Sequence, residues 1–476
     1  MKLYESLASE LRHRIETGLY MDGQRLPSIR TLSRDHGVSI ATVQEAYRRL
    51  EDDGLAEPRP KSGYFVRRRA AQAALPEVSR PAQRPVEVSH WEEVMFLLCS
   101  SEQRDAVTLS GATPDLTAPA LRPLLRGMAG SGRDDNSGLR YGRLTGEPSL
   151  RAQIARLALD AECVLHPDEI IVTSGCQEAL ACCIRALTRP DEVIAVDSPS
   201  FYGSMQTIRA NGLKAMEIPT HPETGISLDA LELALEQWPI KVLQITPTCN
   251  NPLGYTMPDD NKRRLIALAQ RFDLAIIEDD IYGDLAYHYP RPRTLKSFDV
   301  DGRVLLCSGF SKTLAPGLRL GWVAPGRYYE RVAHMKYVSS GGSATAAQLA
   351  AARFIAGGDY ARHVRRARTL YRERRDVMMD LVCREFPGCA RVSRPQGGYL
   401  LWVELPTEVD TIVLNRRLAA HGVKIAPGAL FSASGKYRNC LRLSYADAPG
   451  PRIVGAVREI GREVARMLDE VPGRAA

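Results

Sequence analysis

The 476-residue chain lacks the patterns of a membrane, secreted or metal-binding protein. It has no run of 18 or more apolar residues, so no transmembrane helix is expected. Its first residues lack the basic-then-apolar order of a secretory signal. Ten cysteines are scattered without a Cys-x-x-Cys pair or a cluster with histidine, which argues against a zinc site and a disulfide framework. We therefore expect a cytoplasmic protein with no membrane contact and no metal.

Length and charge indicate more than one domain but say little about partners. A chain of 476 residues exceeds one ordinary core, so two or three domains are expected. The net charge is +7, and residues 1–69 hold 13 Lys/Arg against 10 Asp/Glu, so this short segment contributes three of the seven excess charges. Because most charge excess is solvated surface, the positions of these charges matter more than their number.

Residues 1–66 have the pattern of a small helical domain that ends in a hairpin. Apolar spacing predicts a first helix, followed by a second that begins after Pro27 and ends at Gly37. Ser39 can cap a third helix. The stretch Ala56–Val66 has prolines and a Ser-Gly pair between short apolar pieces, which predicts a two-stranded wing.

The second and third helices, joined by Gly37-Val38-Ser39, form a helix-turn-helix pattern. The second helix of such a motif enters the DNA major groove with its N-terminal residues nearest the bases. Cations on a wing can hold backbone phosphates. The predicted DNA contacts are at the start of this helix, on the helix before it and on the wing: Ser39, Ile40, Ala41, Thr42, Arg30, Arg59, Lys61 and Gly63. A small dimerisation module with ordinary surface charge is the alternative.

The order of motifs in this segment closely resembles the GntR-type winged helix. The resemblance rests on Leu26-Pro27-Ser28-Ile29-Arg30-Thr31-Leu32, Gly37-Val38-Ser39 with Thr42-Val43, Leu50 with Gly54-Leu55, and Ser62-Gly63-Tyr64-Phe65-Val66. It covers residues 1–66 without a gap. It implies binding to double-stranded DNA.

From about residue 91, short apolar runs alternate with amphipathic helices. Such runs, bounded by Gly, Pro, Asp or Ser, are typical of buried parallel strands; they are Ile170–Val172, Val193–Val196, Val242–Ile245, Leu274–Ile277 and Val304–Leu306. They favour an α/β architecture with a largely parallel sheet. The piece Gly397–Val403 suggests a smaller α+β domain near the C-terminus. Residues 70–90 are rich in Ala, Pro and polar residues, which predicts a semi-extended linker.

The most informative segment runs from Ser311 to Trp322 and contains Lys312. An aldehyde cofactor needs a lysine amine held at a fixed place to form a Schiff base. A cofactor phosphate needs hydroxyls and a permanently charged fork, which Ser311 and Arg319 could supply. Taken alone, Lys312 could equally be a surface lysine in a Gly/Pro-rich loop.

Three other strand ends carry groups that suit the same cofactor. Glu278-Asp279-Asp280-Ile281-Tyr282 offers a carboxylate for a pyridine nitrogen and a phenol for the 3-oxygen of the ring. An amide in Asn250-Asn251 can donate to the same oxygen. Gly175-Cys176-Gln177 opens a helix whose free N–H groups would cradle a phosphate. Each motif is common alone, because acidic strand ends are most often structural or metal-binding and the others are ordinary turns.

Together, residues from about 105 to 450 resemble the fold type I aminotransferases, whose cofactor is pyridoxal 5′-phosphate (PLP). The resemblance implies that Lys312 forms the Schiff base and that Asp279, three before Tyr282, pairs with the pyridine nitrogen. Tyr282 and Asn251 would hold the 3-oxygen. The residues implied around the phosphate are Gly175, Cys176, Gln177, Ser311 and Arg319.

Three more roles follow from the resemblance. Phe201 takes the place of the aromatic residue that stacks on the cofactor ring. Tyr141, in Tyr-Gly-Arg-Leu-Thr-Gly, resembles the tyrosine that reaches the phosphate of the neighbouring subunit. Arg442, in Leu-Arg-Leu-Ser-Tyr, resembles the arginine that grips the substrate α-carboxylate, with Asn251 as a second residue at the substrate or effector.

The chain departs from the aminotransferase pattern at three positions. Gly309 stands where the family usually has a phosphate-binding serine, and Ser308 is one step off. Cys176 replaces a common serine, and Phe201 lacks the hydroxyl of the usual tyrosine. Each change loses a hydrogen bond of roughly 0.5–1.5 kcal/mol net, so we expect a lowered PLP affinity. Because the lysine, the aspartate and the arginines are kept, we do not expect a dead site.

A winged helix, a linker and an aminotransferase-like body resemble, in this order, the MocR group of bacterial regulators. The implied domains are 1–69, 70–90 and 91–476, with a small subdomain at roughly 330–476 plus an N-terminal contribution. The resemblance implies a transcriptional regulator that binds DNA as a head-to-tail homodimer and senses an amino acid or amine through aldimine exchange at Lys312. Two alternatives stay open: a 2-oxo-acid-dependent amino-acid aminotransferase with a DNA-binding domain, and a cofactor-free DNA-binding scaffold.

Overall fold

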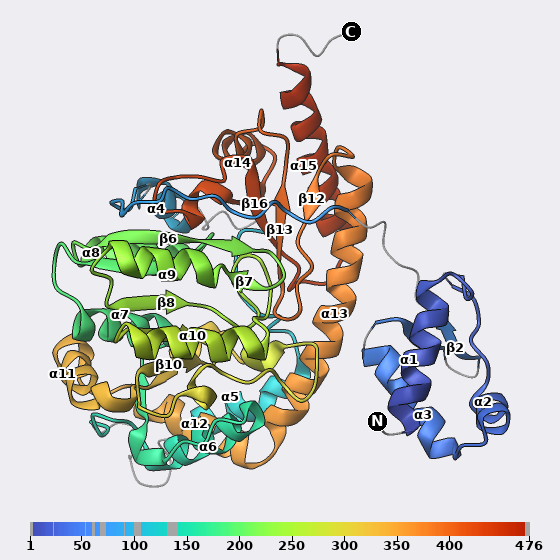
Figure 1. The fold of residues 1–476 in the computed structure, drawn as a ribbon, viewed down its shortest axis with the longest axis horizontal. Coiled ribbons are helices and arrows are strands. Elements are labelled where there is room, and N and C mark those ends of the chain that lie inside the picture. Colours follow the sequence, from blue (N-terminus) through green and yellow to red (C-terminus); the bar gives the residue numbers. More distant parts are fainter. Residues whose placement is uncertain are drawn as a thin grey trace. The chain divides into compact units, whose positions relative to one another are not determined.

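The computed structural model describes residues 3–21, 23–52, 54–59, 62–66, 73–89, 91–99, 106–130 and 141–471. They form two compact units, Met1–Gln72 and Ala73–Ala476 (Figure 1). Among the described residues, no helix is both long enough and apolar enough to cross a membrane.

The first unit contains the predicted three helices and a wing. Its elements are α1 (Leu3–Glu16), α2 (Ile29–His36), α3 (Ile40–Asp52), β1 (Ala56–Arg59) and β2 (Gly63–Val66), with the two strands antiparallel. Ser28 caps α2 by accepting a hydrogen bond from the Thr31 N–H at 3.1 Å, and Gly37 ends the helix at a φ of 62°. Ser39 caps α3 in the same way, by accepting from the Thr42 N–H at 3.1 Å.

Tyr47 joins the wing to α3. Its ring stacks on that of Tyr64 from β2, with centroids 4.3 Å apart and planes 4° from parallel. Its hydroxyl donates to the Pro27 carbonyl. Tyr47 lies in the core of this unit beside fully buried residues of α1 and α3, namely Leu11, Val43, Ala46 and Leu50. The wing is therefore fixed to the helix that the sequence predicts to enter DNA.

The second unit is built on an eight-stranded sheet in the order β4-β11-β10-β9-β8-β5-β6-β7. Strands β10, β9, β8, β5 and β6 are mutually parallel, whereas β11 is antiparallel to both of its neighbours and β7 is antiparallel to β6. This confirms the largely parallel sheet predicted from the apolar runs. The strands are β4 (Ile171–Thr173), β5 (Val193–Ser198), β6 (Lys214–His221), β7 (Gly225–Ile226), β8 (Val242–Ile245), β9 (Ala275–Asp279), β10 (Val304–Gly309) and β11 (Gly321–Ala324).

Successive residues of these strands belong to different cores, because a strand directs its side chains to alternate faces. Val196 and Ile277 pack on the side of α7 and α8, while Ala195 and Ile276 pack on the side of α9 and α10. Figure 1 shows α9 and α10 lying along the sheet. These helices are α7 (Cys176–Leu187), α8 (Tyr202–Ala210), α9 (Leu228–Gln237) and α10 (Asp259–Arg271).

A second, antiparallel sheet lies toward the C-terminus, in the order β12-β13-β16-β15. An earlier strand, β3 (Val107–Thr108), pairs in parallel with β14 (Val423–Lys424), so an N-terminal segment contributes to this region. The sheet strands are β12 (Arg391–Val392), β13 (Leu400–Glu404), β15 (Ala426–Pro427) and β16 (Cys440–Ser444). The remaining helices are α4 (Trp91–Cys99), α5 (Arg122–Gly130), α6 (Pro148–Ala158), α11 (Tyr329–Ser340), α12 (Thr345–Ala356), α13 (Asp359–Glu385), α14 (Thr411–Ala419) and α15 (Pro451–Asp469).

Residues 73–89, here called the strap, lie within the range predicted as a semi-extended linker. They belong to the second unit and are bonded along its surface. Val86 pairs with Ala215 of β6 through two backbone hydrogen bonds of 2.9 and 2.8 Å, and the Ala74 carbonyl accepts from the Val392 N–H at 2.9 Å. Prolines keep this segment extended, and an extended backbone offers its N–H and C=O groups to a sheet edge.

Candidate functional site

Lys312 lies in the loop between β10 and β11, with its amine inside the second unit. Nζ donates to the Ala112 carbonyl at 2.8 Å, and the Tyr399 hydroxyl donates to the same carbonyl at 3.0 Å. Burial, together with the nearby Arg442 guanidinium, lowers the pKa of Lys312 to about 8. A lysine with a depressed pKa is more often neutral near pH 7 and is therefore a better nucleophile.

Asp279, the last residue of β9, is buried close to Lys312 and Cys176. Its Oδ1 accepts from the Ile281 N–H at 3.1 Å and from the Cys176 thiol at 3.5 Å. Burial raises the pKa of Asp279 to about 6. This buried carboxylate is well suited to pair with a protonated ring nitrogen. The positive charge of the ring would lower the pKa of Asp279 again and so stabilise its ionised form.

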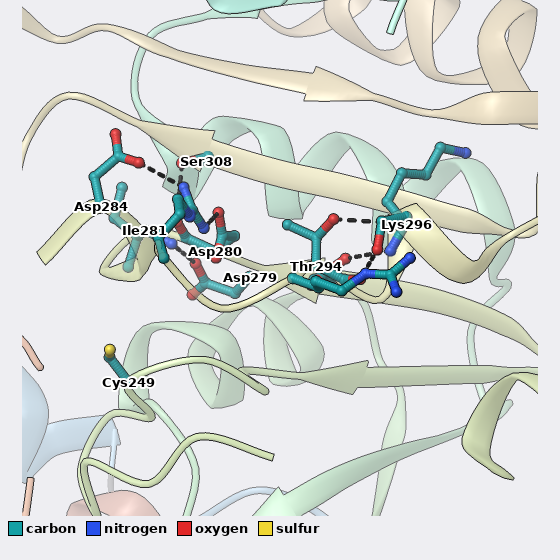
Figure 2. Close-up of polar contacts among 12 residues, drawn as sticks. Cys249, Asp279, Asp280, Ile281, Asp284, Thr294, Lys296 and Ser308 are labelled. Atoms are coloured by element: carbon teal, nitrogen blue, oxygen red, sulfur yellow. Dashed lines mark hydrogen bonds and ion pairs between the residues drawn. The ribbon is translucent and has the colours of Figure 1, made fainter. Parts of the chain in front are cut away.

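The neighbours of Asp279 in the acidic motif are held in other contacts. Asp280 pairs with Arg291 at 2.5 Å, and Glu278 accepts from the N–H groups of Leu295 and Lys296 at 2.8 and 2.9 Å. Figure 2 shows the Asp280 and Thr294–Lys296 groups in this network. Strand alternation thus separates three consecutive carboxylates and leaves Asp279 on the Lys312 side.

Tyr282 has a buried hydroxyl with no hydrogen-bond partner among the described residues. Its ring meets that of Tyr399 edge to face, with centroids 5.6 Å apart. A buried hydroxyl without a partner carries a desolvation penalty of about 1–3 kcal/mol, so the position calls for a further polar group. The 3-oxygen of PLP would supply that partner, and this orphaned hydroxyl is the feature of the site that best fits the cofactor.

Arg442 on β16 is completely buried. Nη1 donates to Oδ1 of Asn251 at 3.0 Å, Nη2 donates to the Ser110 carbonyl at 2.6 Å, and Nε has no partner among the described residues. The rings of Phe431 and Tyr202 lie 5.1 and 5.7 Å from its guanidinium carbon. A buried, permanently charged fork without a carboxylate partner can bind one from a ligand.

The turn before α7 is shaped for close approach. Gly175 has a φ of 93°, which few other residues adopt, and a Cβ there would lie 2.8 Å from Nη2 of Arg319. Nη2 of Arg319 donates to the Ser174 carbonyl at 2.8 Å, so the guanidinium lies at this turn. Ser311 is buried. The first N–H groups of α7 have no partner within the helix, so turn and arginine together can cradle a phosphate.

Gln177 and Phe201 meet at the start of α8. Nε2 of Gln177 donates to the Gly203 carbonyl at 3.0 Å and to Oγ1 of Thr207 at 2.9 Å, so the side-chain amide is engaged. The backbone N–H of Gln177 lies in the first turn of α7 and is one of the groups that could donate to a phosphate. Phe201 is the N-cap residue of α8 and is half-buried. A Cβ on Gly203 would lie 2.5 Å from the Phe201 ring, so this glycine allows the ring its place.

The departures noted in the sequence have structural reasons. A Cβ at Gly309 would lie 2.9 Å from the Leu320 carbonyl oxygen and 3.1 Å from the Gly321 Cα, so the backbone at the start of β11 leaves no room for a serine there. The Ser308 hydroxyl donates to the Asp280 carbonyl at 3.0 Å and does not take over the role of the missing serine. The Cys176 thiol faces Asp279, so only its backbone N–H is available at the phosphate turn.

Tyr141 is fully exposed, with a relative accessible surface of 105%. The predicted role of this residue in a neighbouring subunit stays a prediction. Sequence reasoning missed the Ser110 and Ala112 carbonyls and Tyr399, which contact Arg442 and Lys312. Backbone carbonyls carry no sequence signal. Tyr399 follows Gly397-Gly398, in a stretch whose sequence indicates only a smaller α+β domain.

In the first unit, the predicted DNA contacts divide into structural and outward-facing groups. The hydroxyls of Ser39 and Thr42 lie 2.8 Å apart and form the α3 cap. Ile40, Ala41 and Arg30 are exposed.

On the wing, the Arg59 Nε donates to Glu57 at 2.9 Å, and its guanidinium lies 4.3 Å from the Phe65 ring centroid. Gly63 has a φ of 97° beside exposed Arg25, a cation that the sequence analysis did not single out. Lys61 lies outside the described residues.

The lowered pKa of Lys312 predicts how the cofactor-free protein takes up PLP. Because only the neutral amine attacks an aldehyde, the rate should rise about tenfold per pH unit below the pKa and level off above about 8. Arg442→Gln should move the midpoint upward, because the guanidinium lowers the pKa. Stopped-flow absorbance across a pH series measures it, with Arg327→Gln as a control outside the site. A wild-type midpoint near 10.5, the ordinary lysine value, would contradict the prediction.

The close approach of Gly321 to the turn at Gly175 and Cys176 allows the role of this turn in phosphate binding to be tested by a steric substitution. A Cβ there would lie 2.3 Å from the Gly175 carbonyl carbon and 2.5 Å from the Cys176 nitrogen, so Gly321→Ala must displace the turn. We expect PLP affinity to fall about tenfold, as overpacking of a rigid site commonly does. Gly317→Ala is the matched control, because a Cβ there meets nothing within 4 Å. Equal PLP affinities of the two variants, measured by absorbance titration, would refute this role of the turn.

Comparison with known proteins agrees with this geometry. Residues 98–458 match the family described as aminotransferase class I and II, and residues 3–66 match the bacterial regulatory proteins of the gntR family. The HTH-type transcriptional regulators YjiR and YdcR of Escherichia coli, both described as uncharacterized, are 49% and 33% identical, each over 98% of this chain and 100% of its own.

Solved structures of aminotransferases share the fold of the second unit. The multiple substrate aminotransferase of Thermococcus profundus is 28% identical with a TM-score of 0.74, over 80% of this chain and 97% of its own. LysN, an α-aminoadipate aminotransferase of Thermus thermophilus, is 28% identical with a TM-score of 0.73, over 79% and 95%. The chain therefore belongs to the aminotransferase class I and II family, with PLP as its cofactor, and is a transcriptional regulator that carries a gntR-family DNA-binding domain at its N-terminus.

Proposed function

We propose that this regulator, of the MocR kind, senses an amino acid or an amine that displaces Lys312 from PLP. The observation that carries the proposal is Arg442, a fully buried guanidinium with an unpartnered Nε close to the Lys312 amine. A carboxylate bound by Arg442 and an amine directed to the place of Lys312 describe an α-amino acid. The relatives named for 2-aminoadipate and aromatic amino acids act on ligands of this class.

The residues of the site divide the work of holding the cofactor. PLP supplies an aldehyde that bonds reversibly to primary amines and a ring that withdraws electrons. Asp279 would keep a proton at the pyridine nitrogen, and Tyr282 and Asn251 would donate to the 3-oxygen. Phe201 would cover the ring. The start of α7 and Arg319 would bind the phosphate, with Ser311 beside them.

A ligand carboxylate could replace the present hydrogen-bond partners of Arg442, and this replacement could serve as a signal. Nη2 of Arg442 is bonded to the Ser110 carbonyl and Nη1 to Asn251. A ligand carboxylate would compete for these donors and form a charge-assisted, bidentate pair in their place. Binding would thus release the segment around Ser110, whose next residues include Ala112, the acceptor of Lys312. The ligand therefore changes two contacts of one segment, which is the differential interaction that a two-state switch requires.

The strap offers a physical route from this site toward the DNA-binding unit. It is bonded to β6 of the large sheet at Val86 and to β12 of the C-terminal sheet at Ala74. Glu77 forms an ion pair of 2.8 Å with Arg391, and the Ser89 N–H donates to the Ala433 carbonyl at 2.9 Å. A segment bonded to two sheets must strain or rearrange when one moves relative to the other. We propose that ligand binding acts on the first unit through this segment.

We further propose a head-to-tail homodimer. Fully exposed Tyr141 would complete the phosphate site of the second copy, and two copies would present two winged helices to DNA. Size-exclusion chromatography with light scattering measures the oligomeric state. Tyr141→Phe should weaken PLP binding and leave the homodimer intact.

The central test combines two readouts on the PLP-loaded protein. A screen of amino acids and amines should find ligands that both shift the absorption band of the lysine-bound cofactor and change the affinity for a duplex taken from upstream of the gene. Arg442→Gln should lower the affinity for amino acids by about tenfold or more and leave the affinity for simple amines unchanged, because only amino acids carry a carboxylate. Ligands that shift the band and never alter DNA affinity would defeat the sensor proposal. Rapid multiple turnover with a 2-oxo acid would favour an aminotransferase instead.

If the strap transmits the signal, a strap variant should bind the amino acid and the DNA duplex, but the amino acid should no longer change the DNA affinity. Val86→Pro removes the N–H that donates to Ala215 at 2.9 Å, whereas Val86→Ala keeps it. The proline variant should retain PLP, amino acid binding and DNA binding, while its DNA affinity becomes insensitive to the amino acid. The alanine variant should respond like wild type. If both variants respond alike, in fluorescence anisotropy with a labelled duplex, the strap does not transmit the signal.

A further inference from the structure

The outward side of α3 is uncharged over its first five residues. Ile40, Ala41 and Gln44 are exposed on this side. The opposite side of the helix is fully buried in the core of the unit, through Val43, Ala46, Tyr47 and Leu50. An exposed surface without charge lacks the cations that supply most phosphate binding, which makes these side chains candidates for contacts with base edges.

The N-terminal cap of α3 reduces the number of side chains at the start of this helix that are free to contact DNA bases. The Ser39 hydroxyl accepts from the Thr42 N–H at 3.1 Å, and the hydroxyls of Ser39 and Thr42 lie 2.8 Å apart. Both hydroxyls are therefore engaged within the helix start. Ile40 and Gln44, one helical turn apart, are the exposed long side chains that remain there.

Ile40 is half exposed, with a relative accessible surface of 50%, although it is a large apolar residue. Exposed cations lie on the preceding helix, α2: Arg30 is exposed, and the side chain of Arg34, which pairs with Asp35 at 3.5 Å, is 81% exposed. Exposed cations on the helix that precedes an uncharged helix start suit a duplex, in which phosphates border the groove that displays the bases. This charge pattern favours DNA over a second protein surface as the partner of Ile40.

We infer that Ile40 reads the methyl group of a thymine and that Gln44 reads an adenine. In the major groove, thymine alone presents a C5-methyl group, and adenine presents an N6 donor beside an N7 acceptor that a glutamine amide matches with two hydrogen bonds. Each half-site of the operator then contains A·T pairs under the start of α3. This assignment of specificity rests on the proposed function as a DNA-binding regulator.

The thymine contact is tested by removing one methyl group at a time. Duplexes that bind the full-length, PLP-loaded protein are selected from a random pool, and each thymine is replaced by deoxyuridine. At one position in each half-site, wild type should lose about fourfold in affinity, the value of one buried methyl group. Ile40→Ala should lose nothing further there. Leu19→Ala is the matched control, because Leu19 is an exposed leucine in the same unit, at 65%, outside α3.

The adenine contact is tested with 7-deazaadenine, which lacks the N7 acceptor. One such replacement in each half-site should weaken wild type about tenfold, and Gln44→Ala should be insensitive at that position. Ile40 and Gln44 are exposed, so circular dichroism should show both variants folded.

Two outcomes overturn the inference. In the first, the DNA affinity of the wild-type protein does not change with any deoxyuridine or deazaadenine replacement. In the second, the variants lose as much DNA affinity as wild type at the sensitive positions. Both are distinct from failure of the proposed function, in which no duplex binds even at low salt.

Discussion

The second unit depends on the alternation of side chains along parallel strands. At the end of β9, alternation directs Asp279 toward α7 and Lys312, while Glu278 and Asp280 bind backbone N–H groups and Arg291 elsewhere. On the neighbouring strand, the same alternation takes the Ser308 hydroxyl to the Asp280 carbonyl and away from the phosphate turn. A shift of one residue in either strand would exchange these positions, so the register of the sheet decides which acid lies on the Lys312 side.

Charge in the site is arranged so that each buried group acts on another. Burial raises the pKa of Asp279, and burial together with Arg442 lowers that of Lys312. Both shifts favour the neutral forms, which is the expected response of ionisable groups in a dry interior. Arg442 cannot adapt in this way, because a guanidinium stays charged, and its carbonyl and amide partners leave a carboxylate as the natural counter-ion. The buried arginine thus lowers the pKa of Lys312 and offers a charge that a ligand carboxylate could neutralise.

Function in this chain arises from joining two sites of different chemistry. The DNA-binding unit presents an uncharged start of α3 and exposed cations on α2, and the second unit presents a buried lysine amine at Lys312. The strap contacts two sheets of the second unit, β6 of the large sheet and β12 of the C-terminal sheet. Under the proposed sensing mechanism, a ligand that repositioned one sheet would act on the segment that leads along the chain to the first unit.

Local patterns were enough to predict the helices of the first unit, the wing, the buried strands and the presence of the Lys312 motif. These depend on apolar periodicity, caps and turns, which short stretches of sequence specify by themselves. The separate contacts of Glu278, Asp279 and Asp280 were not predictable, since they depend on register and on partners far along the chain.

The chain itself determined that a lysine, an acid and an arginine occur in the order of an aminotransferase and that a winged helix precedes them. Only the tertiary structure decided that Gly309 leaves no room for a serine, that the strap is bonded to the second unit, and that Arg442 holds the Ser110 carbonyl. The reason is physical: close approach, backbone pairing and burial each require segments distant in sequence to meet, and no local pattern records that meeting.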